Sequence, residues 1–281
     1  MKTKQKTISL LTLVFLVLLS ANFSYAQSAN FHIYLCFGQS NMEGHSKFEP
    51  QDTIGDPRFQ VMATVDCPTS SREKGQWYIA TPPLTRCNTG LTPADYFGKT
   101  LVAQLPDSVQ VGVINVAVGG CHIHLFDKDS TASYAAHAPD WMKGVLASYD
   151  NDPYKRLVDM GKIAQQKGII KGILLHQGES NTGDTDWPNK VNKVYQNLLE
   201  DLNLRASETP LLAGELLSAE QGGKCASMNA IINTLPLTIP NAHIVSSEGC
   251  EGVPDGLHFS TKGYRALGNR YAEVMLDILM D

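Results

Sequence analysis

The sequence predicts a three-layer α/β/α sandwich built on a five-stranded parallel sheet. Five short apolar segments alternate with segments whose apolar residues recur at helical spacing, and no hairpin signal interrupts this alternation. The first apolar segment, residues 31–37, is almost continuously apolar, which is typical of a parallel strand that is covered on both faces.

Each element is expected from a local pattern. The strands are expected at residues 31–37, 109–118, 169–175, 211–217 and 242–246. Capping or proline residues predict that helices begin at Thr92, Asp152 and Trp187, near residue 227, and at Ser260 or Thr261. Residues 45–91 show no clear period, so we expect a long loop with short strands at most. Long loops in compact domains are often functional.

The first 26 residues have the features of a secretory signal peptide. Three lysines precede an apolar stretch from Ile8 to Leu19, and small residues precede a cleavage site after Ala26. A transmembrane anchor is the alternative, but it needs about 20 apolar residues and this stretch is shorter. We therefore expect a secreted or periplasmic protein without a membrane anchor, in which residues 27–281 form a single domain.

The charge balance excludes some classes of partner. The formal net charge is −5, and removal of residues 1–26, which contain three lysines and no acidic residue, changes it to −8. An acidic protein of this kind is not expected to bind nucleic acids or anionic membranes. The sequence leaves the oligomeric state open.

Six cysteines are spread along the chain without a C-x-x-C pair, so a zinc or redox motif is not expected. In an oxidising compartment some of them should form disulfides. Cys67 and Cys87 lie in one polar loop region, and Cys225 and Cys250 flank the last helix–strand unit. We expect these two pairs, although sequence alone does not determine the connectivity.

Residues suited to catalysis follow three of the expected strands. Ser40 comes after the first strand, Gly119 and Gly120 after the second, and the segment from His176 to Glu179 after the third. Ligands of parallel α/β sheets bind at the carboxyl ends of the strands. The sequence therefore predicts a site at this edge of the sheet, with the Ser40 hydroxyl in it.

A base and an acid for Ser40 occur together near the end of the chain. Asp255 and His258 are three residues apart in a loop before the last expected helix. The carboxylate can accept a hydrogen bond from one ring nitrogen while the other nitrogen faces the serine hydroxyl. A capping aspartate beside an incidental histidine is the alternative, and it is weakened by the position of this loop after the fifth strand.

Four motifs together resemble the SGNH-hydrolase superfamily, and more closely its branch of sialate O-acetylesterases and acetylxylan esterases. They are Gly38-Gln39-Ser40-Asn41-Met42, Gly119-Gly120, His176-Gln177-Gly178-Glu179-Ser180 and Asp255-Gly256-Leu257-His258, in the order of the family. The resemblance implies a serine esterase that removes O-acetyl groups from carbohydrates, without a metal or another cofactor.

The resemblance also implies a role for each motif. Ser40 matches the nucleophile, His258 the base and Asp255 the acid that orients the base. The backbone N–H groups of Ser40 and Gly120 are expected to form part of the oxyanion hole. The third donor differs from the wider superfamily, which has an asparagine after its third strand.

The His176–Ser180 motif offers two residues for the remaining roles. The side-chain amide of Gln177 can donate a hydrogen bond to an oxyanion, so we expect it to be the third donor. Glu179 is expected either to hold the loop or to compete with Asp255 as the orienting acid, and Asp255 is favoured because of its short connection to His258.

Two other functions remain open from the sequence. The chain could hydrolyse another acyl ester, such as a feruloyl or lipid ester, or it could bind carbohydrates without catalysis. Trp77, Trp141 and Trp187 are candidates for sugar stacking, although each could equally be a packing residue. Trp77, in the long loop, is the preferred candidate.

Overall fold

The computed structural model describes residues 28–280 of the 281-residue chain, and the expected signal peptide lies outside the described residues. Within this range the strands form one seven-stranded sheet in the order β3-β2-β4-β1-β5-β6-β7. Neighbouring strands are parallel, except that β3 is antiparallel to β2. The strands are β1 (Ser28–Gly38), β2 (Phe59–Met62), β3 (Trp77–Ile79), β4 (Gln110–Ala117), β5 (Gly168–His176), β6 (Leu211–Gly214) and β7 (Ala242–Val245).

The three-layer α/β class is confirmed, and the number of strands is corrected from five to seven. The two additional strands, β2 and β3, lie in the segment 45–91, where only a loop with short strands was expected. They contain four and three residues, too few for a period of two to stand out from the surrounding polar sequence. The edge strand β3 also makes the sheet mixed instead of purely parallel.

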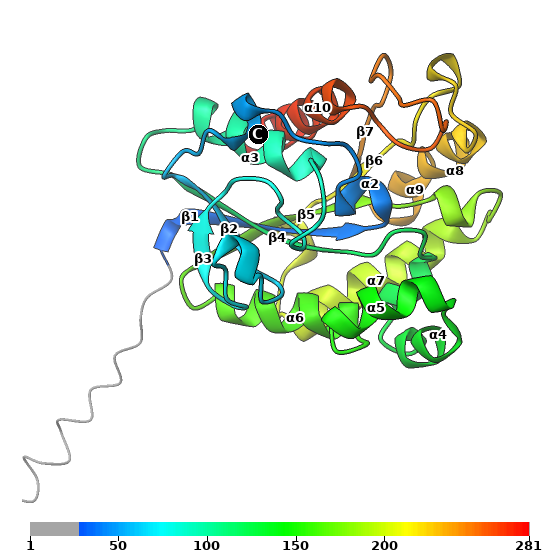
Figure 1. Ribbon diagram of the computed structural model, residues 1–281, viewed down its shortest axis with the longest axis horizontal. Coiled ribbons are helices and arrows are strands. Elements are labelled where there is room, and N and C mark those ends of the chain that lie inside the picture. The colour runs from blue at the N-terminus through cyan, green and yellow to red at the C-terminus, as the bar shows by residue number, and fades with distance from the viewer. Residues whose placement is uncertain (1–27, 281) are drawn as a thin grey trace, which may run out of the picture.

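Helices cover both faces of the sheet (Figure 1). The helices are α2 (Ser40–Glu43), α3 (Pro93–Gln104), α4 (Thr131–His137), α5 (Asp140–Ser148), α6 (Pro153–Ala164), α7 (Trp187–Asp201), α8 (Asn229–Ile232), α9 (Leu235–Thr238) and α10 (Thr261–Met280). Residues of α3 and α10 pack in one apolar cluster, and residues of α5, α6 and α7 pack in another. Helices α4 and α5 were not expected, and α8 and α9 replace the single short helix expected near residue 227.

The central strand β1 shows how the two layers are joined. Ile33, Leu35 and Phe37 face the cluster that contains α6 and α7, whereas Tyr34 and Cys36 face the cluster that contains α3 and α10. Successive side chains of a strand point to opposite faces, so a strand between two helical layers must be apolar throughout. Full burial of each large apolar side chain stabilises the fold by about 1.5–3 kcal/mol.

The cysteines match one of the two expected pairs. Cys67 and Cys87 form a disulfide, as predicted. Cys225 and Cys250 are both free, so the second expected pair is wrong. The Cys225 Sγ lies 3.8 Å from the carbonyl oxygen of Glu179, whereas the Cys250 Sγ lies 3.4 Å from the Arg270 guanidinium. The two thiols therefore contact different parts of the structure. Their positions on either side of the last helix–strand unit in the sequence did not reveal this.

A search of residues 28–280 finds no helix that is both long enough and apolar enough to cross a bilayer.

Candidate active site

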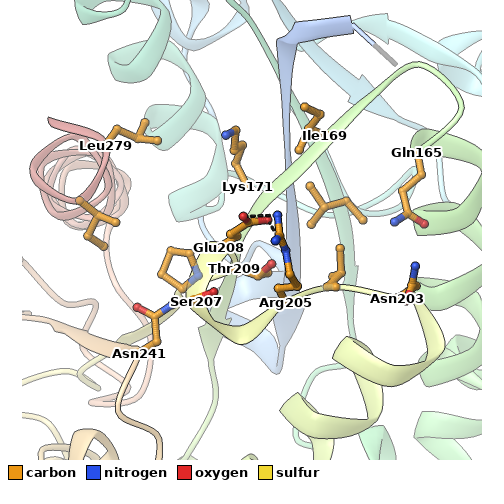
Figure 2. Close-up of a pocket in the computed structure, with 14 residues that line it drawn as sticks. Gln165, Ile169, Lys171, Asn203, Arg205, Ser207, Glu208, Thr209, Asn241 and Leu279 are labelled. Carbon is orange, nitrogen blue, oxygen red and sulfur yellow. Dashed lines mark hydrogen bonds and ion pairs between the residues drawn. The ribbon is translucent and has the colours of Figure 1, made fainter. Parts of the chain in front are cut away.

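Two cavities lie at opposite ends of the sheet. The first, of about 590 Å³, lies at the amino ends of β5, β6 and β7, and its wall includes the ion pair between Arg205 and Glu208 (Figure 2). None of the fourteen described residues that line it is a histidine or a cysteine. The second, of about 410 Å³, lies at the carboxyl ends of the strands, where the sequence predicted a site.

The second cavity collects residues from every motif of interest, and we call it the Ser40 pocket. Its lining comes from the ends of β1, β4 and β5, from helix α5 and from the loop before α10. The lining residues are Gln39, Ser40, His45, Gly119, Gly120, Trp141, Glu179, Ser180, Cys225, Leu257 and His258.

The position of Ser40 depends on a glycine that ends β1. Gly38 has φ +152°, and a Cβ at this position would clash with the carbonyl group of His176 on the neighbouring strand. The backbone N–H of Gln39 donates to that same carbonyl oxygen at 3.0 Å. The chain can therefore turn directly out of the sheet, and Ser40 becomes the first residue of the one-turn helix α2.

Ser40, His258 and Asp255 form one hydrogen-bonded array. The Ser40 Oγ lies 2.8 Å from the His258 Nε2, and the His258 Nδ1 lies 2.7 Å from the Asp255 Oδ2. These distances are within the range at which a base can take a proton from a serine hydroxyl. The structure thus brings Ser40 against Asp255 and His258, which lie more than 200 positions further along the sequence.

The Asp255 carboxylate is held in its ionised form. Burial by itself would raise the pKa of Asp255, but hydrogen bonds from the His258 ring and from the backbone N–H groups of Leu257 and His258 lower it to about 2. The two backbone bonds measure 2.7 and 3.0 Å and fix the other carboxylate oxygen. An ionised, fixed carboxylate sets the tautomer of His258 and stabilises the imidazolium.

Asn41, which the sequence analysis did not assign, connects helix α2 to the loop of the histidine. Its Nδ2 donates to the Glu179 Oε1 at 2.6 Å and to the carbonyl oxygen of Leu257 at 3.0 Å. Its Oδ1 accepts from the Tyr264 hydroxyl at 2.7 Å and from the backbone N–H of Phe259 at 3.3 Å. Asn41 therefore fixes helix α2, which carries Ser40, relative to the loop that carries His258.

Glu179 is in the wall of the Ser40 pocket but does not contact His258 as Asp255 does. One carboxylate oxygen accepts from Asn41, and the other, Oε2, is buried without a hydrogen-bond partner among residues 28–280. Burial raises the pKa of Glu179 to about 7, against the opposing effects of a backbone N–H and the Asn41 amide. Of the two acids, the structure places Asp255 against the base.

The raised pKa of Glu179 predicts a pH-dependent stability. The folded protein binds the Glu179 proton more tightly than the unfolded chain does. The protonated carboxyl group therefore contributes fully to the free energy of unfolding below pH 4.5, its usual pKa, and this contribution is lost as the pH rises through about 7. Glu179→Gln removes the titration. We expect the variant's melting temperature to rise relative to the unmodified protein between pH 5 and pH 8, measured by differential scanning fluorimetry. A difference that does not change with pH would contradict this assignment.

Backbone donors face the nucleophile from two turns. Within residues 28–280, no hydrogen-bond acceptor is found for the backbone N–H groups of Ser40, Gly119 or Gly120. A Cβ at Gly119 would stand 3.6 Å from the Cβ of Ser40, so this turn passes close to the serine. The Ser180 hydroxyl donates to the Gly120 carbonyl oxygen at 3.0 Å and fixes the turn. The expected donors Ser40 and Gly120 therefore both line one pocket.

The expected third donor, Gln177, does not reach the Ser40 pocket, and this assignment is corrected. Gln177 is 1% exposed, and its Nε2 donates to Asn181 at 2.7 Å and to the Cys121 carbonyl at 3.2 Å. Its Oε1 accepts from the Trp187 indole at 2.6 Å. The amide is thus committed to the protein interior. Its spacing in the motif did not reveal the direction in which its side chain points.

Gln39, and not Gln177, is among the residues that line the Ser40 pocket. Its Oε1 accepts from the Gln177 Nε2 and from the backbone N–H groups of Gly178 and Ser180, at 3.2–3.3 Å. Three donors to one oxygen fix the orientation of the amide. The side chain lines the pocket, and no acceptor is found for its NH₂ group among the described residues.

His45 is a second histidine at the pocket. Its ring lies parallel to that of His258, with centroids 3.7 Å apart and an interplanar angle of 7°. Burial lowers the pKa of His45, and the His258 ring lowers it further, which favours the neutral form. Ligand atoms of His45, Asp255 and His258 lie within 4.8 Å of one another, and the His258 Nδ1 already lies 2.7 Å from the Asp255 Oδ2.

The three tryptophans differ in their positions, and the preference for Trp77 is wrong. Trp77 is half-buried and packs edge-on against Phe31 with ring centroids 4.9 Å apart. Trp187 is fully buried beneath the pocket. Trp141, on the unexpected helix α5, is 64% exposed and lines the Ser40 pocket.

A serine, a histidine and an ionised aspartate in one array, at the carboxyl ends of parallel strands and beside free backbone N–H groups, define a serine hydrolase of the α/β class. Comparison with known families agrees with this class. A family model described as carbohydrate esterase, sialic acid-specific acetylesterase, matches residues 30–277. The chain belongs to this family and is a carbohydrate esterase, a hydrolase of carboxylic esters.

Solved structures share the fold at low sequence identity. A protein of Arabidopsis thaliana superposes with a TM-score of 0.68 at 23% identity, over 89% of this chain and 98% of that chain. NanS superposes with a TM-score of 0.65 at 16% identity, over 90% and 99%. XAC1771, a carbohydrate acetylesterase from Xanthomonas citri, gives 0.58 at 20%, over 85% of this chain and 55% of that chain.

Proposed function

We propose that this chain removes O-acetyl groups from carbohydrates through an acetyl-enzyme on Ser40. The observation that carries the proposal is the continuous contact from the Ser40 Oγ through His258 to Asp255, at 2.8 and 2.7 Å. In this assignment Ser40 is the nucleophile, His258 the general base and Asp255 the acid that orients it.

The reaction has two stages. His258 takes the proton of Ser40 as the hydroxyl oxygen attacks the acetyl carbonyl, and it then gives the proton to the sugar oxygen as the ester bond breaks. In the second stage His258 takes a proton from water, which attacks the acetyl-enzyme, and Ser40 leaves with that proton as acetate is released. Asp255 remains ionised and stabilises the imidazolium in both stages.

The tetrahedral oxyanion of each stage is held by backbone N–H groups. We assign the N–H groups of Ser40 and Gly120 to this role, together with the side-chain NH₂ of Gln39 in place of Gln177. A donor of this kind stabilises the transition state by about 3 kcal/mol. Asn41 and Ser180 support these donors, because one holds helix α2 and the other holds the glycine turn.

Compartment and domain boundaries complete the proposal. The pattern of the first 26 residues supports secretion or export to the periplasm, with cleavage after Ala26 and residues 27–281 as one catalytic domain. Such a location suits an enzyme that acts on extracellular or cell-wall polysaccharides and their fragments. Nothing in the Ser40 pocket favours a lipid or feruloyl ester over acetyl.

The function is tested by acetate release. Purified protein should release acetate from an acetylated oligosaccharide and should hydrolyse p-nitrophenyl acetate, and treatment with EDTA should leave both rates unchanged. Loss of activity in EDTA with recovery on addition of zinc would contradict the mechanism. Absence of acetate release from every acetyl ester would refute the proposed function as a whole.

A further inference from the structure

We infer that the Ser40 pocket accepts a neutral O-acetylated sugar, whose ring stacks on Trp141, in preference to an acetylated sugar that carries a carboxylate. The inference rests on the proposed acetylesterase function and concerns the choice of substrate. It follows from two independent observations: the position of one indole ring and the charges around the pocket.

Trp141 is placed as a platform beside the reacting group. It is 64% exposed and is the second residue of α5, which carries it to the rim of the pocket. A Cβ at Gly120 would stand 2.7 Å from the Trp141 Cη2, so the edge of the indole lies directly against the glycine turn. A sugar whose acetyl carbonyl meets Gly120 and Ser40 therefore lies within reach of the indole.

The exposure of this ring is unusual for its residue type. Tryptophan is highly buried on average because it has a large apolar surface. Trp187 has no exposed surface, and Trp77 packs on Phe31. Trp141 has no stacking partner within residues 28–280, although ring contacts are present elsewhere in this part of the chain. Its apolar face is open to a ligand, and the C–H face of a pyranose ring can cover it.

The charges around the pocket disfavour an anionic sugar. No lysine or arginine is among the described residues that line it, whereas the acidic residue Glu179 is. The ionised carboxylate of Asp255 lies directly behind His258. A substrate carboxylate in this pocket would find no lysine or arginine in the lining to pair with and would lie near the ionised Asp255, which opposes binding.

The cationic side chains nearest to the Ser40 pocket lie outside its lining. Arg86 is paired with Glu43, beneath the glycine turn. Lys47 lines a separate cavity, which shares only His45 with the Ser40 pocket. Lys224 is next in sequence to the lining residue Cys225, and its side chain packs against Gly256 outside the lining. Lys47 and Lys224 are therefore the candidates for a counterion to an anionic sugar that extends out of the pocket, and the test includes both.

The charge argument is tested with one sugar in two forms. The substrates are 9-O-acetyl-N-acetylneuraminic acid and its methyl ester, which keeps the ring and removes the charge, with an acetylated xylo-oligosaccharide as the neutral reference. We expect kcat/KM for acetate release to be about fivefold or more higher for the methyl ester than for the acid at low salt, with a smaller ratio at high salt. A preference for the free acid would overturn the inference, and its loss in Lys47→Ala or in Lys224→Ala would identify the counterion.

The platform is tested by substitution. Trp141→Ala should raise KM for the acetylated xylo-oligosaccharide about tenfold, because the covered apolar area is lost, and should lower kcat/KM for p-nitrophenyl acetate by a smaller factor. Trp141→Phe should restore part of the affinity. Leu237→Ala is the control, since Leu237 is 88% exposed on α9 and does not line the pocket.

These outcomes separate the inference from the proposed function. Equal losses on both substrates in Trp141→Ala would mean that the indole supports the glycine turn and is not a sugar platform. An unchanged KM on the oligosaccharide would also overturn the platform. In both cases activity on p-nitrophenyl acetate in the unmodified protein would still establish the esterase.

Discussion

Replacement of Ser40 by alanine is expected to reduce acetyl-ester hydrolysis by about 1,000-fold or more, because the reaction loses its nucleophile. The remaining oxyanion donors give only residual catalysis. The rate of p-nitrophenol release at saturating substrate, together with acetate release from an acetylated sugar, measures the loss.

The fold of this variant should be unchanged. The Ser40 hydroxyl contacts His258 at the surface of the pocket, and neither β1 nor α2 depends on it for packing. Ser108→Ala is a matched control, since Ser108 is an exposed serine at the amino end of β4, outside the pocket. An active Ser40→Ala protein with a normal melting temperature would exclude the acetyl-enzyme mechanism.

The second large effect is expected from Asp255. Asp255→Asn should lower kcat by roughly 10³- to 10⁴-fold, because an amide neither fixes the productive tautomer of His258 nor stabilises the imidazolium. The carboxylate accepts three hydrogen bonds, at 2.7, 2.7 and 3.0 Å, so its replacement disturbs both the ring and the loop. Profiles of kcat against pH between pH 5 and pH 9 measure the effect.

Glu179→Gln is the comparison that decides between the two acids. Its carboxylate contacts Asn41 and lies apart from the His258 ring, and a glutamine can still accept the Asn41 bond. We expect a loss of about tenfold or less in kcat, since only the support of Asn41 changes. A larger loss in Glu179→Gln than in Asp255→Asn would reverse the assignment of the orienting acid.

Some parts of the fold could be predicted because their signal is local. The long strand β1 and helices α3, α6, α7 and α10 each bury a full face, so their periodicity is complete in the sequence. Strands β2 and β3 were missed because three or four residues hold too little of a period. Strand β2 depends on pairing with β4, which lies about 50 residues further along the chain, and β3 pairs only with β2.

The Ser40 pocket, too, could be predicted only in part. The order of the motifs predicted that Ser40, Gly120, Asp255 and His258 would meet, and the structure brings them together at one edge of the sheet. The direction of the Gln177 amide could not be predicted, because it depends on Trp187 and on buried partners that pack only in the folded protein.

The sequence by itself determined the α/β class and the residues that could serve as nucleophile, base and acid, because both follow from periodicity and from the spacing of motifs along the chain. Tertiary structure decided which acid contacts His258, which glutamine and which tryptophan line the pocket, and which cysteines pair. The physical reason is that each of these choices depends on a few ångströms between residues far apart in sequence. Such distances are set only when both layers of helices pack on the sheet.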